Sequence, residues 1–283
     1  MVARIQPTAR QVRLGVELRK LREAAGLSSR QAAAFLGTSP AQMSQVEAGN
    51  AGVSGERVRR LAVHYACADP ELVDALVEMA TDRTQGWWEE YRNVLPPEFM
   101  DLAELEHHAR AIQVVATAHV PGLLQTEEYA RAVFGYWVPP LPDGELDLWV
   151  ACRMHRQQVL SREDLVPYEA VLHESVLRTR VADQQVARAQ LDKLLLQSER
   201  PNVSLRVIPF DVDGFAGASS SLLYVGGPVT ALDTVQRDTP YGSAFLDASA
   251  QLHVMRTLFR KVESASLDPA RSRDFIHRLS KEL

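Results

Sequence analysis

Cysteine is scarce in this sequence, because the 283-residue chain contains only Cys67 and Cys152, with no CxxC or CxxH spacing around either. Without such spacing we expect neither a disulfide framework nor a cysteine zinc site. Long apolar runs are also missing: no stretch of about 18 apolar residues occurs, and the opening residues, MVARIQPTARQVR, include no apolar signal segment. The sequence therefore predicts a cytoplasmic protein without a membrane-spanning segment.

The composition has no strong bias, since 46% of the residues are hydrophobic, 24% charged and 7% aromatic. These values are typical of globular protein, and at roughly 150 residues per domain the length predicts two domains. The charge, however, is unevenly distributed. Residues 1–65 contain ten Lys or Arg and four Glu, a net charge of +6, whereas the whole chain carries -5 and the remainder therefore -11. A basic first segment is typical of a polyanion-binding module.

Residues 1–80 are predicted to form an all-α domain of five short helices. Apolar residues recur at helical spacing in each, with Ser or Pro at the starts and Gly at the ends. The boundary signals are Gly26 after the first helix, Ser28 or Ser29 and Gly37 around the second, Ser39-Pro40 and Gly49 around the third, Ser54 before the fourth and Pro70 at the start of the fifth.

Residues 101–283 are predicted to fold as an α+β domain, after a hinge and domain entry at 81–100. We expect helices over 102–118, 126–134, 146–161 and 183–198 and after Pro269, and strands over 168–177, 203–210, 221–225 and 229–233, the last two joined as a hairpin at Gly226-Gly227. Within the hinge, Trp87, Trp88 and Tyr91 suit either an aromatic platform for a ligand or a stacked base, or an interdomain packing interface, and we favour the interface.

The second and third predicted helices have the spacing of a helix-turn-helix, in which the first helix crosses the DNA backbone and the second enters the major groove. Glutamine can pair with adenine, and small apolar groups can meet the thymine methyl. Ala41, Gln42 and Gln45 are therefore the candidate base-reading residues, the alternative being a solvated helix face. The candidate phosphate contacts are Arg10, Arg13, Ser29, Arg30, Ser44, Asn50 and Arg57.

The string LRKLREAAGLSSRQAAAFLGTSPAQMSQVEAG, residues 18–49, resembles the DNA-binding domain of XRE-type repressors. The residues that fill the family pattern are Gly26, Leu27, Ser28, Ala33, Gly37, Ser39, Ser44, Glu47 and Gly49. Two positions depart from it: Ser29 stands where a phosphate-contacting glutamine is frequent, and Gln45 where Arg or Lys is common. The resemblance implies binding to double-stranded DNA, with Glu47 facing the first helix, where Arg19 or Arg22 could hold it.

Four later strings, GWWEEY, VPGLLQTEEYARA, VLHESVLRTRV and PNVSLRVIPFD, resemble the large C-terminal domain of actinobacterial WhiJ-like and antitoxin-like regulators. The resemblance covers nearly the whole chain. It implies a regulator that works with a small partner protein encoded nearby, and it transfers no reaction.

Other chemistry-bearing residues do not combine into a site. The pairs considered are His107-His108, adjacent on a helix; His173-Glu174, on opposite faces of a strand; and Asp211 with Asp213, in a polar turn. The loop at 121–126 could hold an anion at a helix N-terminus, but Glu127 and Glu128 follow it, so a structural role is favoured. We therefore expect no enzyme, no metal and no cofactor.

The sequence thus predicts a sequence-specific DNA-binding transcriptional regulator, a repressor acting as a homodimer, whose C-terminal domain senses a ligand or a partner protein. Two half-sites about 34 Å apart would supply the specificity that a single helix-turn-helix lacks. The alternative is an antitoxin-like adaptor that sequesters a small partner protein and autoregulates its own operon. The charge of -11 beyond residue 65 motivates this alternative.

Overall fold

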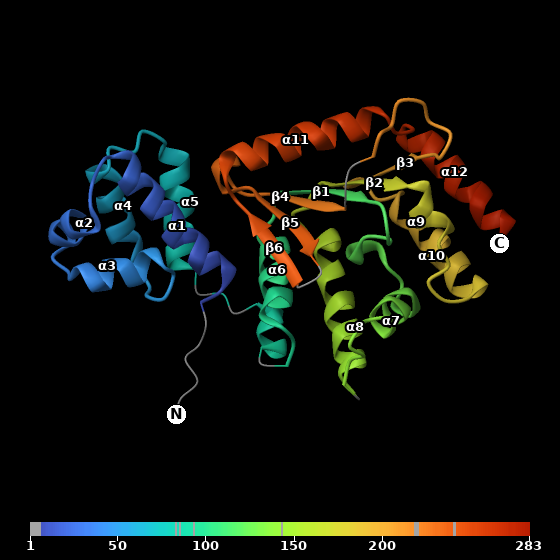
Figure 1. Ribbon diagram of the computed structural model, residues 1–283, viewed down its shortest axis with the longest axis horizontal. Helices are drawn as coiled ribbons and strands as arrows, with labels where there is room; N and C mark the ends of the chain where they lie inside the picture. The colour runs from blue at the N-terminus through green and yellow to red at the C-terminus, as the bar shows by residue number, and fades with distance from the viewer. Residues whose placement is uncertain are drawn as a thin grey trace. The chain divides into compact units, whose positions relative to one another are not determined.

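The structure is a computed structural model that describes residues 7–82, 84, 86–92, 94–142, 144–217, 221–239 and 242–283 (Figure 1). The chain divides into two compact units, residues 1–105 and 106–283, and each is described by itself. Across these ranges, no helix is both long and apolar enough to cross a membrane.

The first unit is helical. Its helices are α1 (Ala9–Ala24), α2 (Ser29–Leu36), α3 (Pro40–Glu47), α4 (Gly55–His64) and α5 (Pro70–Thr81), followed by a 3₁₀ turn, η1 (Trp87–Tyr91), and by α6 (Pro97–His107), which contains the boundary between the units. Helices α2, α3, α4 and α5 begin at the predicted boundary residues, whereas α1 begins at Ala9, before the Val12 start expected from the sequence, and α6 begins at Pro97 rather than at 102. In each of α1 to α5, the capping side chain accepts a hydrogen bond from the backbone N–H three residues later; the caps are Thr8, Ser28, Ser39, Ser54 and Asp69.

The predicted hinge at 81–100 includes Arg83, Gln85 and Asn93, which lie outside the described residues. Its described part contains η1, in which Trp88 is buried while Trp87 and Tyr91 are partly buried. The rings of Trp88 and Tyr91 both meet that of Trp87 edge to face, with centroids 6.0 and 5.9 Å away. The three aromatics therefore pack on one another, and the interdomain interface that the sequence favours for them stays a prediction.

The second unit is built around one mixed sheet of six strands in the order β3-β2-β1-β4-β5-β6. The strands are β1 (Ala111–Ala116), β2 (Tyr168–His173), β3 (Val203–Ile208), β4 (Leu222–Gly226), β5 (Thr234–Thr239) and β6 (Gly242–Leu246). Strands β1, β2 and β3 are mutually parallel because helices connect them, and β4, β5 and β6 add antiparallel.

Helices and 3₁₀ turns connect and cover the sheet (Figure 1). They are η2 (Gly122–Leu124), α7 (Glu127–Gly135), α8 (Glu145–Arg156), η3 (Gln157–Ser161), α9 (Glu174–Arg178), α10 (Gln184–Gln197), η4 (Thr230–Leu232), α11 (Ser249–Ser264) and α12 (Pro269–Glu282). Figure 1 shows α11 lying along one face of the sheet while α7 and α8 lie on the opposite side. The predicted fold class, an all-α helix-turn-helix domain followed by an α+β domain, is confirmed.

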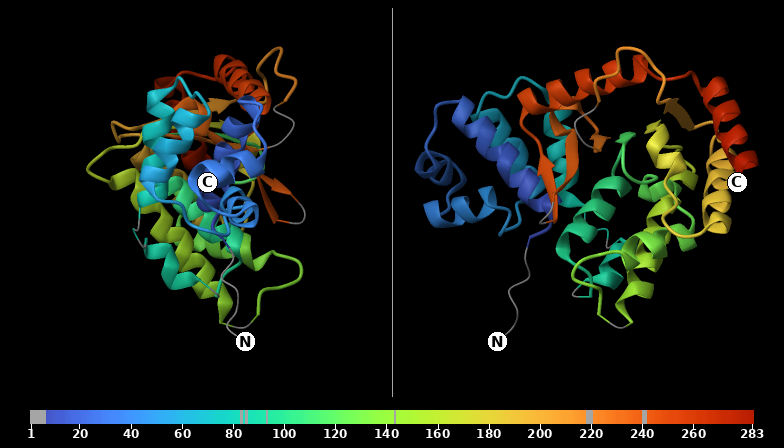
Figure 2. Two further views of the ribbon diagram at one scale, coloured as in Figure 1. Left: turned by 90° about the vertical axis from the view of Figure 1, so that its left-hand side faces the viewer. Right: turned by 45° about the vertical axis from the view of Figure 1, so that its right-hand side comes forward.

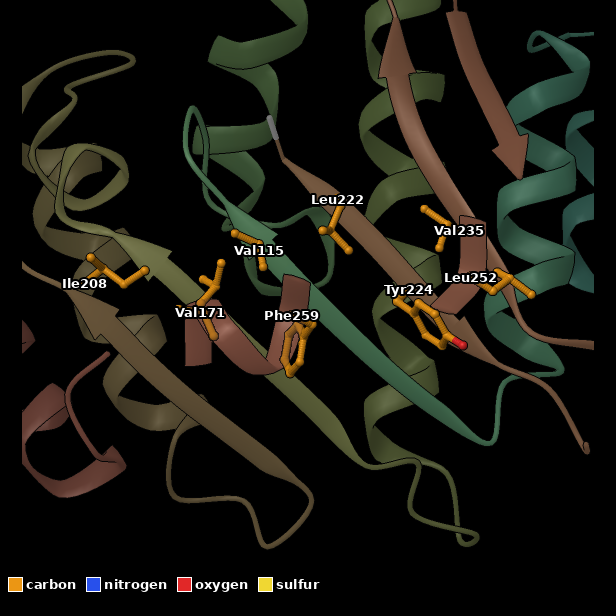
Figure 3. Close-up of a cluster of buried hydrophobic side chains, with 9 residues drawn as sticks. Val115, Val171, Ile208, Leu222, Tyr224, Val235, Leu252 and Phe259 are labelled. Atoms are coloured by element: carbon orange, nitrogen blue, oxygen red, sulfur yellow. The ribbon is translucent and has the colours of Figure 1, made fainter. Parts of the chain in front are cut away.

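The apolar sides of the sheet and of α11 face each other and form a core between them (Figure 3). It consists of Val115, Val171, Ile208, Leu222, Tyr224 and Val235 from the strands and Leu252, Phe259 and Val262 from α11. The register aligns Val115 with Val171 on one side and with Leu222 on the other, so these side chains share a face. Fully burying each such side chain contributes about 1.5–3 kcal/mol of transfer free energy.

Five elements differ from the sequence predictions for the C-terminal domain. The helix expected over 102–118 is wrong beyond His107, because 111–116 form the central strand β1, paired on both sides. The strand expected over 168–177 ends at His173, where Glu174 begins α9 instead of occupying the opposite face of a strand. The strand expected over 229–233 is a 3₁₀ turn that precedes β5. Neither α11 nor β6 is predicted.

Candidate nucleic-acid interface

Helices α2 and α3 form the predicted helix-turn-helix. Helix α2 ends at Gly37, whose φ of +66° is readily adopted by glycine and terminates the helix. After Thr38, Ser39 caps α3 by accepting a hydrogen bond from the backbone N–H of Gln42 at 3.1 Å, and Pro40 occupies the first helical position, where no amide hydrogen is needed. The turn is therefore three residues long and both of its ends are fixed by local chemistry.

Helix α3 has one buried face and one exposed face. Met43 and Glu47, one helical turn apart, are buried, whereas the three candidate base-reading residues Ala41, Gln42 and Gln45 are all exposed. An exposed face of two amides and a methyl group has the size and hydrogen-bonding capacity for reading base edges in a major groove. The structure therefore places the three residues together on the accessible side of α3.

A buried ion pair fastens the inner face of α3 to α1. The Arg22 guanidinium donates to both carboxylate oxygens of Glu47, from Nε at 2.6 Å and from Nη2 at 2.9 Å, and its Nη1 donates to the carbonyl of Leu27 at 2.7 Å. The hydrogen bond to Glu47 raises the pKa of Arg22. Of the two arginines that could hold Glu47, Arg22 does so, while Arg19 pairs with Glu23.

Tyr65 lies next to this pair and is itself buried. Its burial, and secondarily the Glu47 charge, raise the pKa of the phenol to about 12. Tyr65 also lines a surface pocket of about 770 Å³ between the end of α1 and the α4–α5 connection, together with Leu21, Leu27 and Leu72. The ion pair beside Tyr65 is itself shielded from solvent, since its two side chains are only 9% and 8% exposed.

Two glycines let α1 approach the C-terminal end of α3. A Cβ at Gly15 would lie 2.6 Å from the carbonyl oxygens of Val46 and Glu47, and a Cβ at Gly49 would lie 2.7 Å from the Cα of Val12. Real Cβ atoms do not make such contacts, so only glycine permits this backbone packing. The orientation of α3 in the unit is therefore set by backbone contact as well as by the ion pair.

The seven candidate phosphate contacts fall into two groups. Exposed positions are occupied by Arg30, Ser44, Asn50 and Arg57. The other three are partly buried: Arg10, Arg13 and Ser29. The hydroxyl of Ser29 is buried at the N-terminus of α2 and has no hydrogen-bond partner in the part of the chain that the structure describes.

Arg10 and Arg13 are both engaged by acidic side chains of their own unit. Arg10 lies 3.8 Å from Asp82, and its burial lowers the pKa of the guanidinium. Arg13 donates from Nε to Glu17 at 2.7 Å. These partners make Arg10 and Arg13 weaker candidates for phosphate contacts than the exposed group.

Phe35 on α2 is a partly exposed aromatic that sequence reasoning did not single out. Its ring stacks on His64 of α4 with centroids 3.9 Å apart, and the Arg60 guanidinium lies 5.5 Å from the ring centroid. The contact joins α2 to α4 across 29 positions of sequence, and no local pattern indicates it. The Phe35–His64 stacking therefore packs α2 against α4.

The distinctive loop at 121–126 of the second unit is held by protein side chains. Gln125 donates to the Val120 carbonyl at 2.7 Å and accepts from Arg153 at 2.8 Å, and Lys193 donates to the Gln125 carbonyl at 2.6 Å. Thr126 caps α7. Burial lowers the pKa of Lys193. These contacts fix the loop to α8 and α10, and the structural role favoured over anion binding stays a prediction.

His173 and Glu174, two of the other sequence candidates, are hydrogen-bonded within the second unit. His173 Nδ1 lies 2.8 Å from the Ser175 hydroxyl, and Glu174 accepts from the backbone N–H of Phe210 at 2.7 Å. The rings of His107 and His108 meet edge to face with centroids 5.0 Å apart. Among the described residues, no group of three His, Cys, Asp or Glu side chains is arranged to hold a metal ion.

Comparison with known proteins gives a match for each unit. Residues 13–76 match the family described as a helix-turn-helix domain, which supports a DNA-binding regulator, and residues 99–278 match the family described as a domain of unknown function (DUF5753). No curated protein and no solved structure matches the chain. Since the second match covers more than half of the chain, the protein belongs to the DUF5753 family. In this chain the DUF5753 domain follows an N-terminal helix-turn-helix domain.

Proposed function

We propose that the protein is a sequence-specific, XRE-type transcriptional repressor that binds double-stranded DNA as a homodimer through α3. The observation that carries the proposal is the exposure of Ala41, Gln42 and Gln45 on one face of a helix whose opposite face is fixed to α1 by the Arg22–Glu47 pair. A rigidly held helix presents its side chains to a groove without a further ordering cost.

The charges of the first unit support contact with a phosphate backbone. Residues 1–65 carry a net charge of +6, and the exposed Arg30 and Arg57 lie near the N-termini of α2 and α4. Basic side chains and helix N-termini both favour phosphate, and such contacts position a protein on DNA without reading sequence. In this proposal the exposed Arg30, Arg57, Ser44 and Asn50 position α3, whereas the hydroxyl of Ser29 is buried and is not available to a phosphate.

The substitution Gln42→Ala tests the base-reading role. We expect it to weaken binding by about 1–3 kcal/mol at one base pair of the operator, because a bidentate contact is lost, and to leave non-specific binding nearly unchanged. Fluorescence anisotropy with the operator and with single-base-pair variants measures this. By contrast, Arg57→Gln should weaken binding to all sequences alike and reduce the salt slope by about one.

Gln185→Ala, at an exposed position on α10 of the second unit, is the matched control and should bind DNA as the unaltered protein does. A uniform loss on every sequence in Gln42→Ala would show that Gln42 does not read a base.

For the second unit we propose a binding role rather than a reaction, with a ligand or a small partner protein as the signal, as in WhiJ-like regulators. A second candidate function, the antitoxin-like adaptor, is favoured by the net charge of -11 over residues 66–283, because opposite charge speeds and orients association with a basic protein. Stable co-purification of a small neighbouring gene product at physiological salt would favour the adaptor. A ligand-dependent rise in melting temperature would favour a small-molecule sensor.

A further inference from the structure

We propose that the connection between α7 and α8 is a docking surface for a basic, apolar segment of a partner protein. Three large apolar side chains are exposed there, Tyr136 at 90%, Trp137 at 44% and Val138 at 92%; together with Leu148 in the first turns of α8, 40% exposed, we call them the aromatic tip. Figure 2 shows this lime-green connection projecting beyond the two helices. Exposed apolar side chains are costly in water when they cluster, and such clusters mark interaction sites.

The aromatic tip is fixed to the second unit through a buried aromatic cluster. The Trp137 ring lies 4.8 Å from that of Trp149 and 6.1 Å from that of Phe134, centroid to centroid, and both of these partners are buried. Beneath them, the Arg153 guanidinium lies 3.9 Å from the centre of the Phe134 ring. Because Trp137 is held in place, docking on the tip would cost little side-chain ordering.

The accessible area of the aromatic tip is large enough for a short peptide segment only. The four exposed side chains amount to on the order of 500 Å² of accessible surface. A standard interface needs about 800 Å² from each partner. The tip therefore fits one amphipathic helix turn or short strand better than the flat face of a whole domain.

The charges around the tip select a basic occupant. The first turn of α8, directly after the connection, carries two acidic side chains, Glu145 and Asp147. Arg131 of α7 is bonded to Asp147 at 2.5 Å and to Glu127, at the far end of α7, at 3.2 Å. Beside the tip, two carboxylates therefore stand against one guanidinium, and a net negative charge remains. Lys or Arg on the partner would meet this negative charge and could also stack on the faces of Tyr136 and Trp137.

The same charges disfavour two other occupants. A second copy of the chain docking tip to tip about a two-fold axis would place Glu145 and Asp147 against their own counterparts. An anionic lipid surface would be repelled for the same reason. A basic protein segment is the occupant that satisfies both the apolar and the acidic part of the surface.

This inference rests on the partner-binding role proposed for the second unit, and its test uses no DNA, so its failure leaves the role of α3 unaffected. A random dodecapeptide phage library is selected on the full chain after depletion on the double variant Tyr136→Ser/Val138→Ser. Because both side chains are almost fully exposed, we expect the double variant to keep the unaltered melting temperature.

The expected result is enrichment of peptides that combine Lys or Arg with aliphatic or aromatic residues. A fluorescein-labelled selected peptide should lose at least about tenfold in affinity for the double variant. The independent variant Glu145→Gln should also bind it more weakly, and the loss should shrink at high salt. Val63→Ser, which removes a side chain 80% exposed on α4, is the matched control and should bind as the unaltered chain does.

Three results would overturn the inference. Enrichment that is equal on the double variant would place the contact elsewhere, and enrichment of acidic or uncharged peptides would refute the chemistry of the partner. If no selected peptide needs the tip for binding, and the chain binds phosphatidylglycerol vesicles more strongly than the double variant does, the tip is a lipid-binding surface instead.

Discussion

Replacing Glu47 by glutamine tests whether the buried ion pair holds α3 on its unit. The Arg22 and Glu47 side chains are 9% and 8% exposed, and the two hydrogen bonds between them measure 2.6 and 2.9 Å. Glutamine keeps the size of the side chain but removes its charge, and its NH₂ group would face the guanidinium donors. Removing one partner of a buried pair leaves the other charge uncompensated, which costs about 3–5 kcal/mol.

Thermal unfolding of the full chain, followed by far-UV circular dichroism, measures this cost. For a unit of this size about 1 kcal/mol corresponds to roughly 4–8 °C, so the transition of the first unit should fall by at least about 12 °C in Glu47→Gln. The control Glu23→Gln removes a carboxylate that is 51% exposed and paired with Arg19 at 2.7 Å. Exposed pairs contribute at most about 1 kcal/mol, so this variant should melt nearly as the unaltered protein does.

Equal shifts in Glu47→Gln and Glu23→Gln would refute the reasoning, because the buried pair would then contribute no more than a surface pair. A further comparison separates charge from packing. The double substitution Arg22→Met/Glu47→Leu removes both charges together, and it should recover much of the stability lost in Glu47→Gln.

Three further predictions concern other parts of the structure. Gly15→Ala should lower the melting temperature of the first unit although alanine favours helices by about 1 kcal/mol, because the added Cβ meets the Glu47 carbonyl oxygen at 2.6 Å; a rise would contradict that close packing. Burial raises the pKa of Glu104 from 4.5 to about 7. The pKa of Glu104 is thus higher in the folded than in the unfolded chain, so the folded chain holds the proton to higher pH. We therefore expect the free energy of unfolding of the first unit to fall as pH rises from about 4.5 to 7, by up to about 3 kcal/mol. Urea titrations at several pH values measure this, and an unchanged pH dependence in Glu104→Gln would contradict it. Cys152 is buried, and burial raises its thiol pKa to about 11, whereas Cys67 is partly exposed. Ellman's reagent should therefore titrate one thiol rapidly in the folded chain and two after denaturation, and two rapid thiols in the folded chain would show that Cys152 is accessible.

Local signals account for the parts of the fold that the sequence predicts. The caps Ser39 and Ser54 act within three residues of their own position, and a left-handed Gly37 needs no distant partner, so the α2–α3 turn can be read directly. The helix α11 carries such a local signal too, because its buried Leu252, Phe259 and Val262 lie at helical spacing.

Non-local contacts account for the parts that the sequence does not predict. The segment forming β1 becomes a strand because β2 and β4 pair with it, and these partners lie far along the chain. The partner of Arg10, Asp82, is 72 positions away, so no spacing rule indicates that this arginine is engaged. Exposure of Gln42 and Gln45 is predicted, because burial of Met43 fixes the inner face of the short helix α3.

The binding of the full chain to DNA from upstream of its own coding sequence, compared with a scrambled duplex of equal length, tests the central claim most directly. Fluorescence anisotropy at two salt concentrations should show binding about a thousandfold tighter to the upstream DNA, with affinity falling as salt rises and two protomers bound per operator. Equal and weak binding to both duplexes would contradict the assignment of α3 as a sequence-reading helix.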